Sequence, residues 1–169
     1  MEDHRRARQD ARGGPPELSP RVVRGASRAD HGAGGARGPW RVTVADGSML
    51  PSIQPGDWLL VDPTTKRWPR RGSVVVFREP ESGLLAIKRV EARPGDWVRF
   101  GDGWLQMADD EAWLRGDATD EGLAAAGHGP AIDSRRYGPV PVSALVGRVW
   151  FRYGPSRQRV GRLPGPPSG

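Results

Sequence analysis

A chain of 169 residues, of which 36% are hydrophobic, is long enough for one domain with a buried core and leaves little room for a second. Its 24 glycines and 17 prolines predict many turns and loops, and disordered ends. The lack of cysteine excludes disulfides, thiolate metal sites and cysteine nucleophiles, while a net charge of +6 leaves an anionic partner such as nucleic acid or a membrane surface open.

The N-terminal segment, residues 1–38, is rich in Arg, Gly, Ala and Pro and has no sustained apolar period. Such a segment cannot bury enough surface to order itself, so we predict a disordered tail. It lacks the apolar core of a secretory signal peptide, and the chain nowhere shows the roughly 20 apolar residues of a transmembrane helix. We therefore expect a cytoplasmic protein, with peripheral membrane association left open.

Residues 39–155 are predicted to form a single, mainly β domain. Short runs of β-forming residues alternate with turn residues such as Gly56-Asp57 and Pro94-Gly95-Asp96, the pattern of antiparallel hairpins. The predicted strands are Trp40–Ala45, Trp58–Val61, Ser73–Arg78, Leu84–Val90, Trp97–Phe100, Trp104–Met107 and Leu145–Tyr153.

Two further segments are predicted to lie outside the core. Residues 102–130 are acidic and then rich in Ala and Gly, so we expect an inserted surface loop there, with a short helix near residues 121–126. Residues 156–169 return to Arg, Gly and Pro and predict a second disordered tail.

Lys88 is the first candidate for chemistry. Of the 26 basic residues only Lys66 and Lys88 are lysines, and Lys88 lies in the apolar strand Leu84–Val90. A desolvated lysine can lose its proton near neutral pH and act as a base, whereas arginine remains charged. Arg89 is predicted to point to the opposite face of the strand. The alternative is an edge-strand lysine that reaches into solvent.

Ser48 is the matching candidate for a nucleophile. It lies in the turn Asp46–Ser52, directly after a predicted strand and flanked by glycine and proline, so its hydroxyl can be exposed. A serine needs a neighbouring base, and the histidines, His4, His31 and His128, all fall in predicted loops. Lysine is then the remaining base. The alternative is an ordinary turn without chemistry.

The segment Gly47–Ser52 resembles the nucleophile box of type I signal peptidases, Ser-Met-x-Pro followed by Thr or Ser. Further segments resemble the family's other boxes in the same order, and the resemblance covers about residues 42–152. These segments are Pro55–Val61, Arg71–Phe77, Ile87–Val90 with Pro94–Asp96, and Asp133–Val140.

The resemblance implies a fold of coiled antiparallel sheets or a partly open barrel, as in signal peptidases and LexA-like proteins. It also implies a serine endopeptidase with a Ser/Lys dyad, in which Ser48 is the nucleophile and Lys88 the general base. The backbone N–H of Ser48 would donate to the oxyanion. Met49 and Pro51 would support the site, and so would Asp133 and Arg135 as a structural ion pair. No cofactor or metal is implied.

The chain departs from the family pattern at several positions around this site. Many members carry a serine two residues before the nucleophile, whose hydroxyl completes the oxyanion hole, and here that position is Asp46. Ala131 replaces a hydroxyl that orients the lysine amine in some members, and the family's Gly-Asp-Asn run reads Gly116-Asp117-Ala118. An ionised carboxylate cannot donate a hydrogen bond, so Asp46 does not supply the family's second oxyanion donor.

The implied substrate is a precursor protein that loses an N-terminal leader or propeptide. With no predicted anchor, and with a closing stretch at residues 147–153 like theirs, the chain resembles the nickel-type superoxide dismutase maturation proteases. Its arginine-rich composition fits a bacterium of high GC content. We expect no nucleic acid partner.

Two other functions stay open. A LexA-like self-cleaving regulator shares the Ser-Met turn and the Val-Lys-Arg strand, and Ala33-Gly34 is a plausible bond for it to cut. A non-enzymatic, basic β-barrel module is the second, with Trp58, Trp97 or Trp104 stacking on bases, although such tryptophans are more often found packed in a core.

Overall fold

The computed structural model of the chain describes residues 38–154. The predicted tails, apart from Gly38, lie outside this range, and so does the Ala33-Gly34 bond. The strands and helices run in the order β1 (Trp40–Thr43), β2 (Trp58–Asp62), β3 (Val74–Arg78), β4 (Leu85–Ala92), β5 (Trp97–Phe100), β6 (Gly103–Gln106), β7 (Glu111–Arg115), α1 (Asp120–Ala125), α2 (Ser134–Tyr137), β8 (Val140–Pro141), a 3₁₀ turn (Val142–Ala144) and β9 (Leu145–Gly154).

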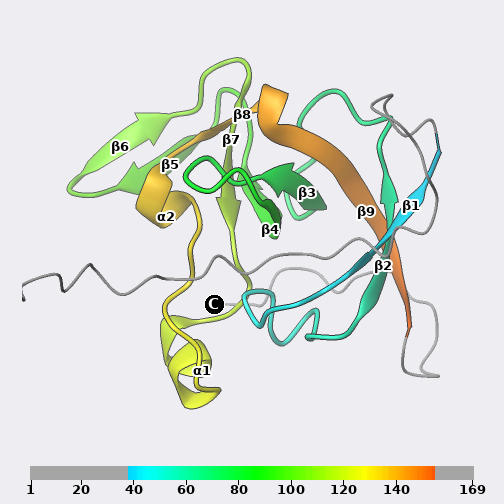
Figure 1. The fold of residues 1–169 in the computed structure, drawn as a ribbon. Helices are drawn as coiled ribbons and strands as arrows, with labels where there is room; N and C mark the ends of the chain where they lie inside the picture. The colour runs from blue at the N-terminus through cyan, green and yellow to red at the C-terminus, as the bar shows by residue number, and fades with distance from the viewer. Residues whose placement is uncertain (1–37, 155–169) are drawn as a thin grey trace, which may run out of the picture.

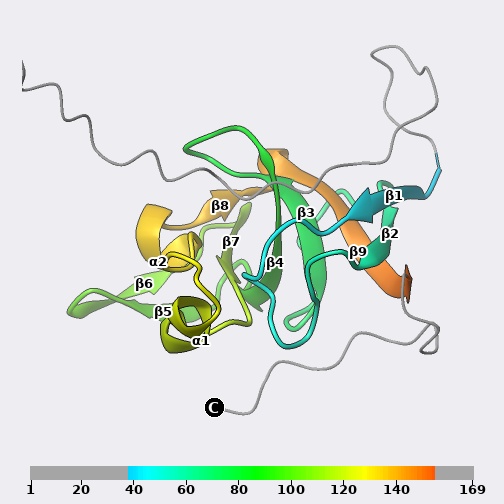
Figure 2. The same cartoon turned by 60° about the horizontal axis from the view of Figure 1, so that its bottom comes forward.

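The strands form one curled sheet of seven strands and one separate hairpin (Figure 1). The order in the large sheet is β1-β2-β9-β3-β4-β7-β8, and every pair is antiparallel; among residues 38–154, β5 pairs with β6 alone. The prediction of a mainly β domain with coiled antiparallel sheets is confirmed. In both views the β5–β6 hairpin lies next to α2, at the end of the domain away from β1 and β2 (Figure 1 and Figure 2).

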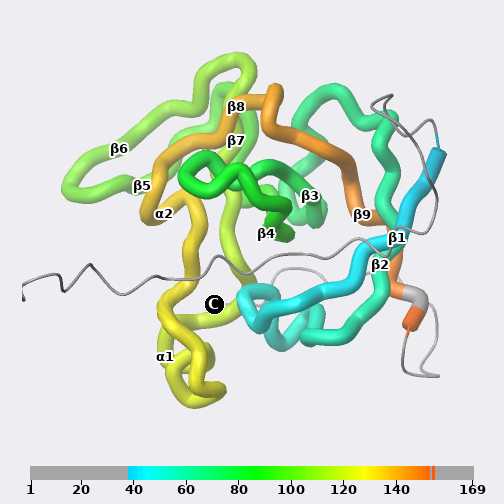
Figure 3. The backbone as a smooth tube through the Cα atoms, viewed as in Figure 1, coloured from blue at the N-terminus to red at the C-terminus, as the bar shows by residue number. Residues whose placement is uncertain are grey.

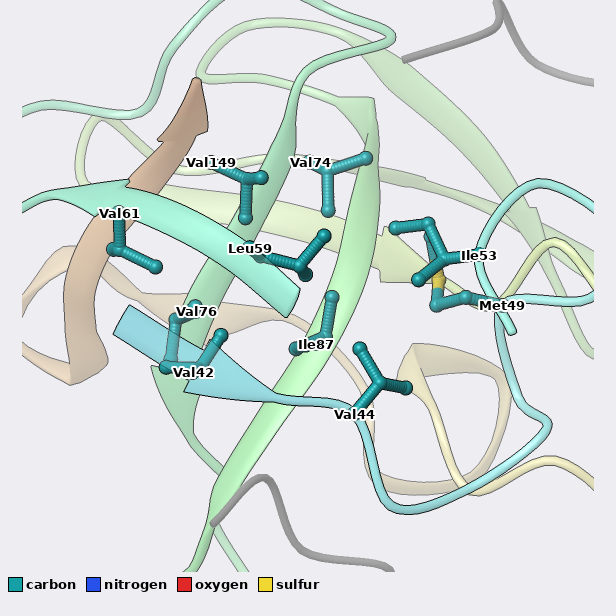
Figure 4. Close-up of a cluster of buried hydrophobic side chains, with 10 residues drawn as sticks. All are labelled: Val42, Val44, Met49, Ile53, Leu59, Val61, Val74, Val76, Ile87 and Val149. Atoms are coloured by element: carbon teal, nitrogen blue, oxygen red, sulfur yellow. The ribbon is translucent and has the colours of Figure 1, made fainter. Parts of the chain in front are cut away.

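The central strand β3 is buried on both faces, which explains its unbroken run of apolar residues. Val74 and Val76 belong to one cluster of buried side chains, which lies between β1–β2 and β3–β4 (Figure 4). Val75 and Phe77 point to the other face and belong to a second cluster with residues of β4, β7 and β8. Alternating side chains of one strand thus serve two cores.

The last strand, β9, joins the two halves of the large sheet because it lies between β2 and β3. Its approach to β2 requires a glycine. A Cβ atom built on Gly147 would lie 2.6 Å from the carbonyl oxygen of Asp62, so any larger residue would force the two strands apart. Glycine in a strand interior often marks such a close backbone approach.

The expectation of an inserted surface loop over residues 102–130 is wrong in part. This segment contains β6 and also β7, which pairs with β4 and β8 in the large sheet. Within β7, Ala112, Trp113 and Leu114 are all buried, so the strand is core despite its acidic surroundings. The predicted short helix is found as α1.

The tryptophans singled out in the sequence do not pack in the core. Trp97 and Trp104 lie on the outer face of the β5–β6 hairpin and are 59% and 66% exposed, and Trp58 is 45% exposed. The opposite face of the hairpin buries Val98 against Trp113. The expectation of core packing fails because the hairpin has one apolar face to bury, and the two tryptophans occupy the other.

Candidate active site

Ser48 lies in a tight turn between β1 and β2, which is hereafter called the serine turn (residues 46–53). The turn is held by backbone hydrogen bonds from Leu50 N–H to the Gly47 carbonyl, at 3.0 Å, and from Ile53 N–H to the Met49 carbonyl, at 2.9 Å. Met49 is 1% exposed and packs in the first core cluster with Ile53. The buried side chains that follow Ser48 in the turn therefore anchor it to the core.

Lys88 approaches the serine turn from β4, in the middle of the sheet. Its Nζ lies 2.7 Å from Ser48 Oγ, a hydrogen-bonding distance between residues 40 positions apart in the chain. The two residues are 4% and 7% exposed. The fold thus places an amine and a hydroxyl in direct contact in a site nearly free of solvent.

Burial lowers the pKa of the Lys88 ammonium, because a charge is poorly solvated in the interior. The negative charges of Asp46, Asp133, Glu79 and Asp117 act in the opposite direction, but burial has the largest effect. Within residues 38–154, none of these carboxylates forms a salt bridge with Lys88. The surroundings therefore favour the neutral amine, which is the form that can accept a proton.

The backbone N–H of Ser48, the expected oxyanion donor, already has an acceptor. It donates to Asp46 Oδ1 at 2.8 Å, within the serine turn itself. Asp46 occupies the position where many family members carry a hydroxyl. The structure therefore shows a carboxylate bound to the N–H group at this position.

The segment after β7 forms the wall behind the serine turn, and the two segments lie side by side in the tube drawing (Figure 3). The Ser48 carbonyl accepts a hydrogen bond from Ala118 N–H at 3.1 Å. A Cβ atom on Gly116 would lie 2.6 Å from the same carbonyl oxygen. The backbone of residues 116–118 therefore determines where Ser48 lies.

Asp133 holds the segment of residues 116–118 in place through a hydrogen bond to its backbone. It is fully buried, and its carboxylate accepts hydrogen bonds from Gly116 N–H at 3.1 Å and from the backbone N–H, Nε and Nη2 of Arg135 at 3.0 Å each. The adjacent Ser134 hydroxyl accepts from Leu114 N–H at 2.9 Å. Asp133 and Arg135 are thus joined by an ion pair, and none of these bonds reaches Ser48 or Lys88.

Sequence reasoning missed a second ion pair, and both of its members are buried. Arg89 points away from Lys88, as strand geometry requires, and its Nε and Nη2 donate to the Asp117 carboxylate at 2.7 and 2.5 Å. Its Nη1 donates to the Gly72 carbonyl at 2.7 Å. This pair ties β4, which carries Lys88, to the wall segment that contacts Ser48. In the sequence, the acidic residue of Gly116-Asp117-Ala118 is the one sign of this ion pair.

A groove of about 830 Å³ opens beside the serine turn. Its lining includes Leu50 and Pro51 of the serine turn, residues 116–119, and the charged side chains of Arg71, Glu91 and Arg115. Ser48 and Lys88 do not line it, so the groove adjoins the pair and does not contain it. Pro51 is exposed and faces this groove, while the neighbouring Met49 is buried. Ala131, where some members place a hydroxyl, donates its backbone N–H to Asp120 Oδ1 at 3.3 Å.

The part of the chain that the structure describes contains no group of three or more His, Cys, Asp or Glu side chains arranged to hold a metal ion.

A family model described as signal peptidase, peptidase S26, matches residues 40–121. The chain is 32% identical over 120 residues to the mitochondrial ATP-independent inner membrane protease subunit 1b of Arabidopsis thaliana, covering 64% of this chain and 66% of that protein. It is 30% identical over 124 residues to the mitochondrial inner membrane protease subunit 1 of Xenopus tropicalis, covering 68% and 69%. The chain belongs to the signal peptidase family.

Other members of the family are longer than the matched region. The chain is 28% identical over 137 residues to the probable thylakoidal processing peptidase 2 of Arabidopsis thaliana, which covers 67% of this chain but 37% of that protein. It therefore spans about two thirds of the mitochondrial relatives and well under half of the thylakoidal one.

The expectation of a cytoplasmic protein is wrong. Several of the relatives are named for the mitochondrial inner membrane or the chloroplast thylakoid, which points away from a cytoplasmic, soluble protein. The expectation was drawn from the lack of a long apolar run, and such a run is only one of several ways in which proteins associate with membranes. No helix within residues 38–154 is long and apolar enough to cross a membrane.

Proposed function

We propose that this chain is a serine endopeptidase that removes N-terminal leader peptides from precursor proteins, with Ser48 as nucleophile and Lys88 as general base. The observation that carries the proposal is the 2.7 Å contact between Lys88 Nζ and Ser48 Oγ in a buried site. Membership of the signal peptidase family supports the same activity.

The first half of the reaction needs Lys88 as a neutral amine. As Ser48 Oγ attacks the carbonyl carbon of the scissile bond, its proton passes to Lys88 Nζ, and the carbonyl oxygen takes up the negative charge. The resulting ammonium then gives its proton to the leaving amine as the C–N bond breaks. The products are a free C-terminal fragment and an ester between the leader and Ser48.

In the second half, water takes the place of the amine. Lys88, neutral again, accepts a proton from a water molecule that attacks the ester carbonyl, and returns it to Ser48 Oγ when the C–O bond breaks. The burial that lowers the Lys88 pKa therefore serves both halves of the cycle. An arginine at this position would stay protonated and could not accept either proton.

Two strand edges near the pair suit an extended peptide. Within the described residues β1 pairs only with β2, and the pairing of β4 with β7 begins at Arg89, so neither β1 nor the first half of β4 has a strand on its other edge. Ser48 follows β1 and Lys88 lies in β4. A peptide that adds as a strand along these edges would bring its carbonyl groups past the pair.

The test compares wild type with Ser48→Ala and Lys88→Ala on precursor proteins that carry N-terminal leaders, with the products identified by mass spectrometry. Lys66→Ala is the matched control, because Lys66 is the other lysine of the chain and is exposed. We expect cleavage by wild type and Lys66→Ala only. Equal cleavage by all four proteins would exclude the dyad. Salt-sensitive binding of single-stranded DNA that survives Ser48→Ala, without any cleavage, would favour the binding module instead.

We further propose a nickel-type superoxide dismutase precursor as the substrate. The proposal rests on the resemblance of residues 147–153 to the maturation proteases of that enzyme. In the structure this stretch lies in β9, and Arg152 Nη1 donates to Asp57 Oδ2 at 2.9 Å, which links it to the residue just before β2. Cleavage of such a precursor at the start of the mature protein, faster than of unrelated leaders, is the expected result. Equal rates on all leaders would contradict it.

A further inference from the structure

The hydrogen bond from Ser48 N–H to Asp46 conflicts with the role of oxyanion donor that the resemblance to signal peptidases implies for this N–H. An N–H group that is to stabilise a developing oxyanion must be free to donate to it. Here that N–H donates at 2.8 Å to a carboxylate oxygen of its own chain. A carboxylate oxygen and an oxyanion are both negatively charged acceptors, so Asp46 occupies the Ser48 donor in the same way as the reacting oxygen would.

Asp46 is held more loosely than the other carboxylates near the site. Within the described part of the chain, its hydrogen bond to Ser48 N–H is the one bond that its side chain makes. Asp133 accepts four hydrogen bonds and is fully buried, and Asp117 is held by two hydrogen bonds from Arg89. Asp46 is half-buried, so its side chain has solvent to turn towards.

The backbone around Ser48 has much less freedom than the Asp46 side chain. A Cβ atom on Gly47 would lie 2.9 Å from Leu50 Cδ1 and 3.1 Å from His128 Cδ2, and the Ser48 carbonyl is fixed by Ala118 N–H. Rotation of the Asp46 side chain would therefore free the Ser48 N–H without moving Ser48 away from Lys88.

We propose that Asp46 is a positioning residue that caps the Ser48 N–H in the free enzyme, and that the carbonyl oxygen of a bound leader must displace this carboxylate before Ser48 attacks. The proposal rests on the proposed peptidase function. In the free enzyme the Asp46 carboxylate therefore covers the Ser48 N–H, and a substrate that binds in the correct position displaces it. A peptide that binds in a wrong position does not displace the carboxylate from the Ser48 N–H and is not cleaved.

Replacing Asp46 by serine tests the cap. Asp46→Ser removes the competing carboxylate and supplies a hydroxyl that can donate to the oxyanion, so kcat is expected to rise by about 10- to 100-fold, the range that corresponds to a hydrogen bond with a charged partner. Asp62→Ser is the matched control. Asp62 Oδ1 accepts the N–H of Thr64, two residues further on, also at 2.8 Å, but in an exposed turn at the end of β2.

A leader-derived peptide aldehyde gives a second measurement that does not depend on turnover. Ser48 Oγ adds to the aldehyde carbon, the C=O π bond opens, and the Oγ proton passes to Lys88, so that the former carbonyl oxygen becomes an oxyanion. We expect Asp46→Ser to bind the aldehyde about 10- to 100-fold more tightly than wild type. Asp62→Ser should bind it as wild type does, and Ser48→Ala should form no adduct.

The pH profile tests whether the charge of Asp46 acts on Lys88. The charged groups around Lys88 are Asp46 in the serine turn, Asp117 and Asp133 in and below the wall segment, and Glu79 after β3, with Arg89 next to it in β4. Asp46 raises the Lys88 pKa against the effect of burial, so Asp46→Ser should move the rising limb of kcat/KM to lower pH. A lost turn alone would not move it.

The outcomes are distinct. Faster turnover and tighter aldehyde binding by Asp46→Ser, with Asp62→Ser unchanged, support the cap. A folded Asp46→Ser variant with kcat and aldehyde affinity equal to or below those of wild type overturns the cap. If Ser48→Ala is inactive in the same assays, the peptidase function still holds. If wild type and Ser48→Ala behave alike in every assay, the peptidase function fails and the cap fails with it.

Discussion

Gly116 offers a sharp test of how the wall segment positions the nucleophile. In Gly116→Ala the new Cβ atom would lie 2.6 Å from the Ser48 carbonyl oxygen, about 0.8 Å closer than the 3.4 Å of an ordinary contact. The new Cβ is fixed directly to the backbone of residue 116 and meets a backbone oxygen, and Gly116 is also tied to Asp133 through its N–H. The strain can be relieved only by moving the serine turn or the wall.

The size of the effect follows from that displacement. A misplacement of about 1 Å in an active site can cost about 100-fold in rate, and an overpacked position typically costs about 1–3 kcal/mol of stability. We therefore expect Gly116→Ala to lose about two orders of magnitude in kcat/KM for a leader substrate, measured on the folded fraction. The free energy of unfolding, measured by urea denaturation, should fall by about 1–3 kcal/mol.

Gly147→Ala provides the matched control. Its Cβ atom would also meet a backbone oxygen at 2.6 Å, that of Asp62, but between β9 and β2, strands that carry neither Ser48 nor Lys88. It should lose a similar amount of stability and keep the turnover of its folded fraction. If both variants lost the same turnover, or if Gly116→Ala kept wild-type turnover, the reasoning about the wall would be refuted.

Two further predictions concern the buried charges. Lys88→Met should abolish cleavage and unfold at higher urea concentration than wild type near neutral pH, because methionine fills the site without a buried amine. In wild type, the free energy of unfolding should rise with pH between the lowered Lys88 pKa and 10.5, because in that range the unfolded chain binds a proton that the folded chain has lost. The slope should approach about 1.4 kcal/mol per pH unit in wild type and be absent in Lys88→Met. Parallel pH profiles of the two proteins would contradict this. Arg89→Ala and Asp117→Ala should each lower the free energy of unfolding by about 3–5 kcal/mol, because each single change leaves an unpaired buried charge. The double variant should lose much less than the sum of the two. Arg115→Ala, which breaks an exposed pair with Glu91, should cost under about 1 kcal/mol in the same denaturation assay, and equal costs for the two pairs would show that burial is not the cause.

Most of the strands could be predicted from the sequence because their boundaries carry clear turn residues. The strand β7 could not, since it lies among acidic residues and its three central residues, Ala112, Trp113 and Leu114, are all buried. A short strand that is covered on both faces has no alternation of polar and apolar residues to reveal it. The two-residue strand β8 contains Pro141, which a sequence pattern would assign to a turn or an edge.

The chemistry of the site was predictable only in part. That Lys88 lies in an apolar strand is visible in the sequence, but its contact with Ser48 depends on how β1 and β4 come together through the sheet. The Arg89–Asp117 pair joins residues 28 positions apart, and no local pattern shows it. By contrast, Asp46 is followed by a glycine and a serine, and aspartate commonly accepts a backbone N–H two residues on, so that bond could have been expected from sequence.

The position of β9 affects when, during synthesis, the protein can begin to cleave peptides. The β1–β2 hairpin leads into and out of the serine turn, the β3–β4 hairpin carries Lys88, and β9 is the strand that lies between the two hairpins. A nascent chain that has not yet released residues 145–154 from the ribosome lacks that connection. We expect Ser48 and Lys88 to remain on separate hairpins until then, so that translation itself delays proteolysis until the last strand has emerged.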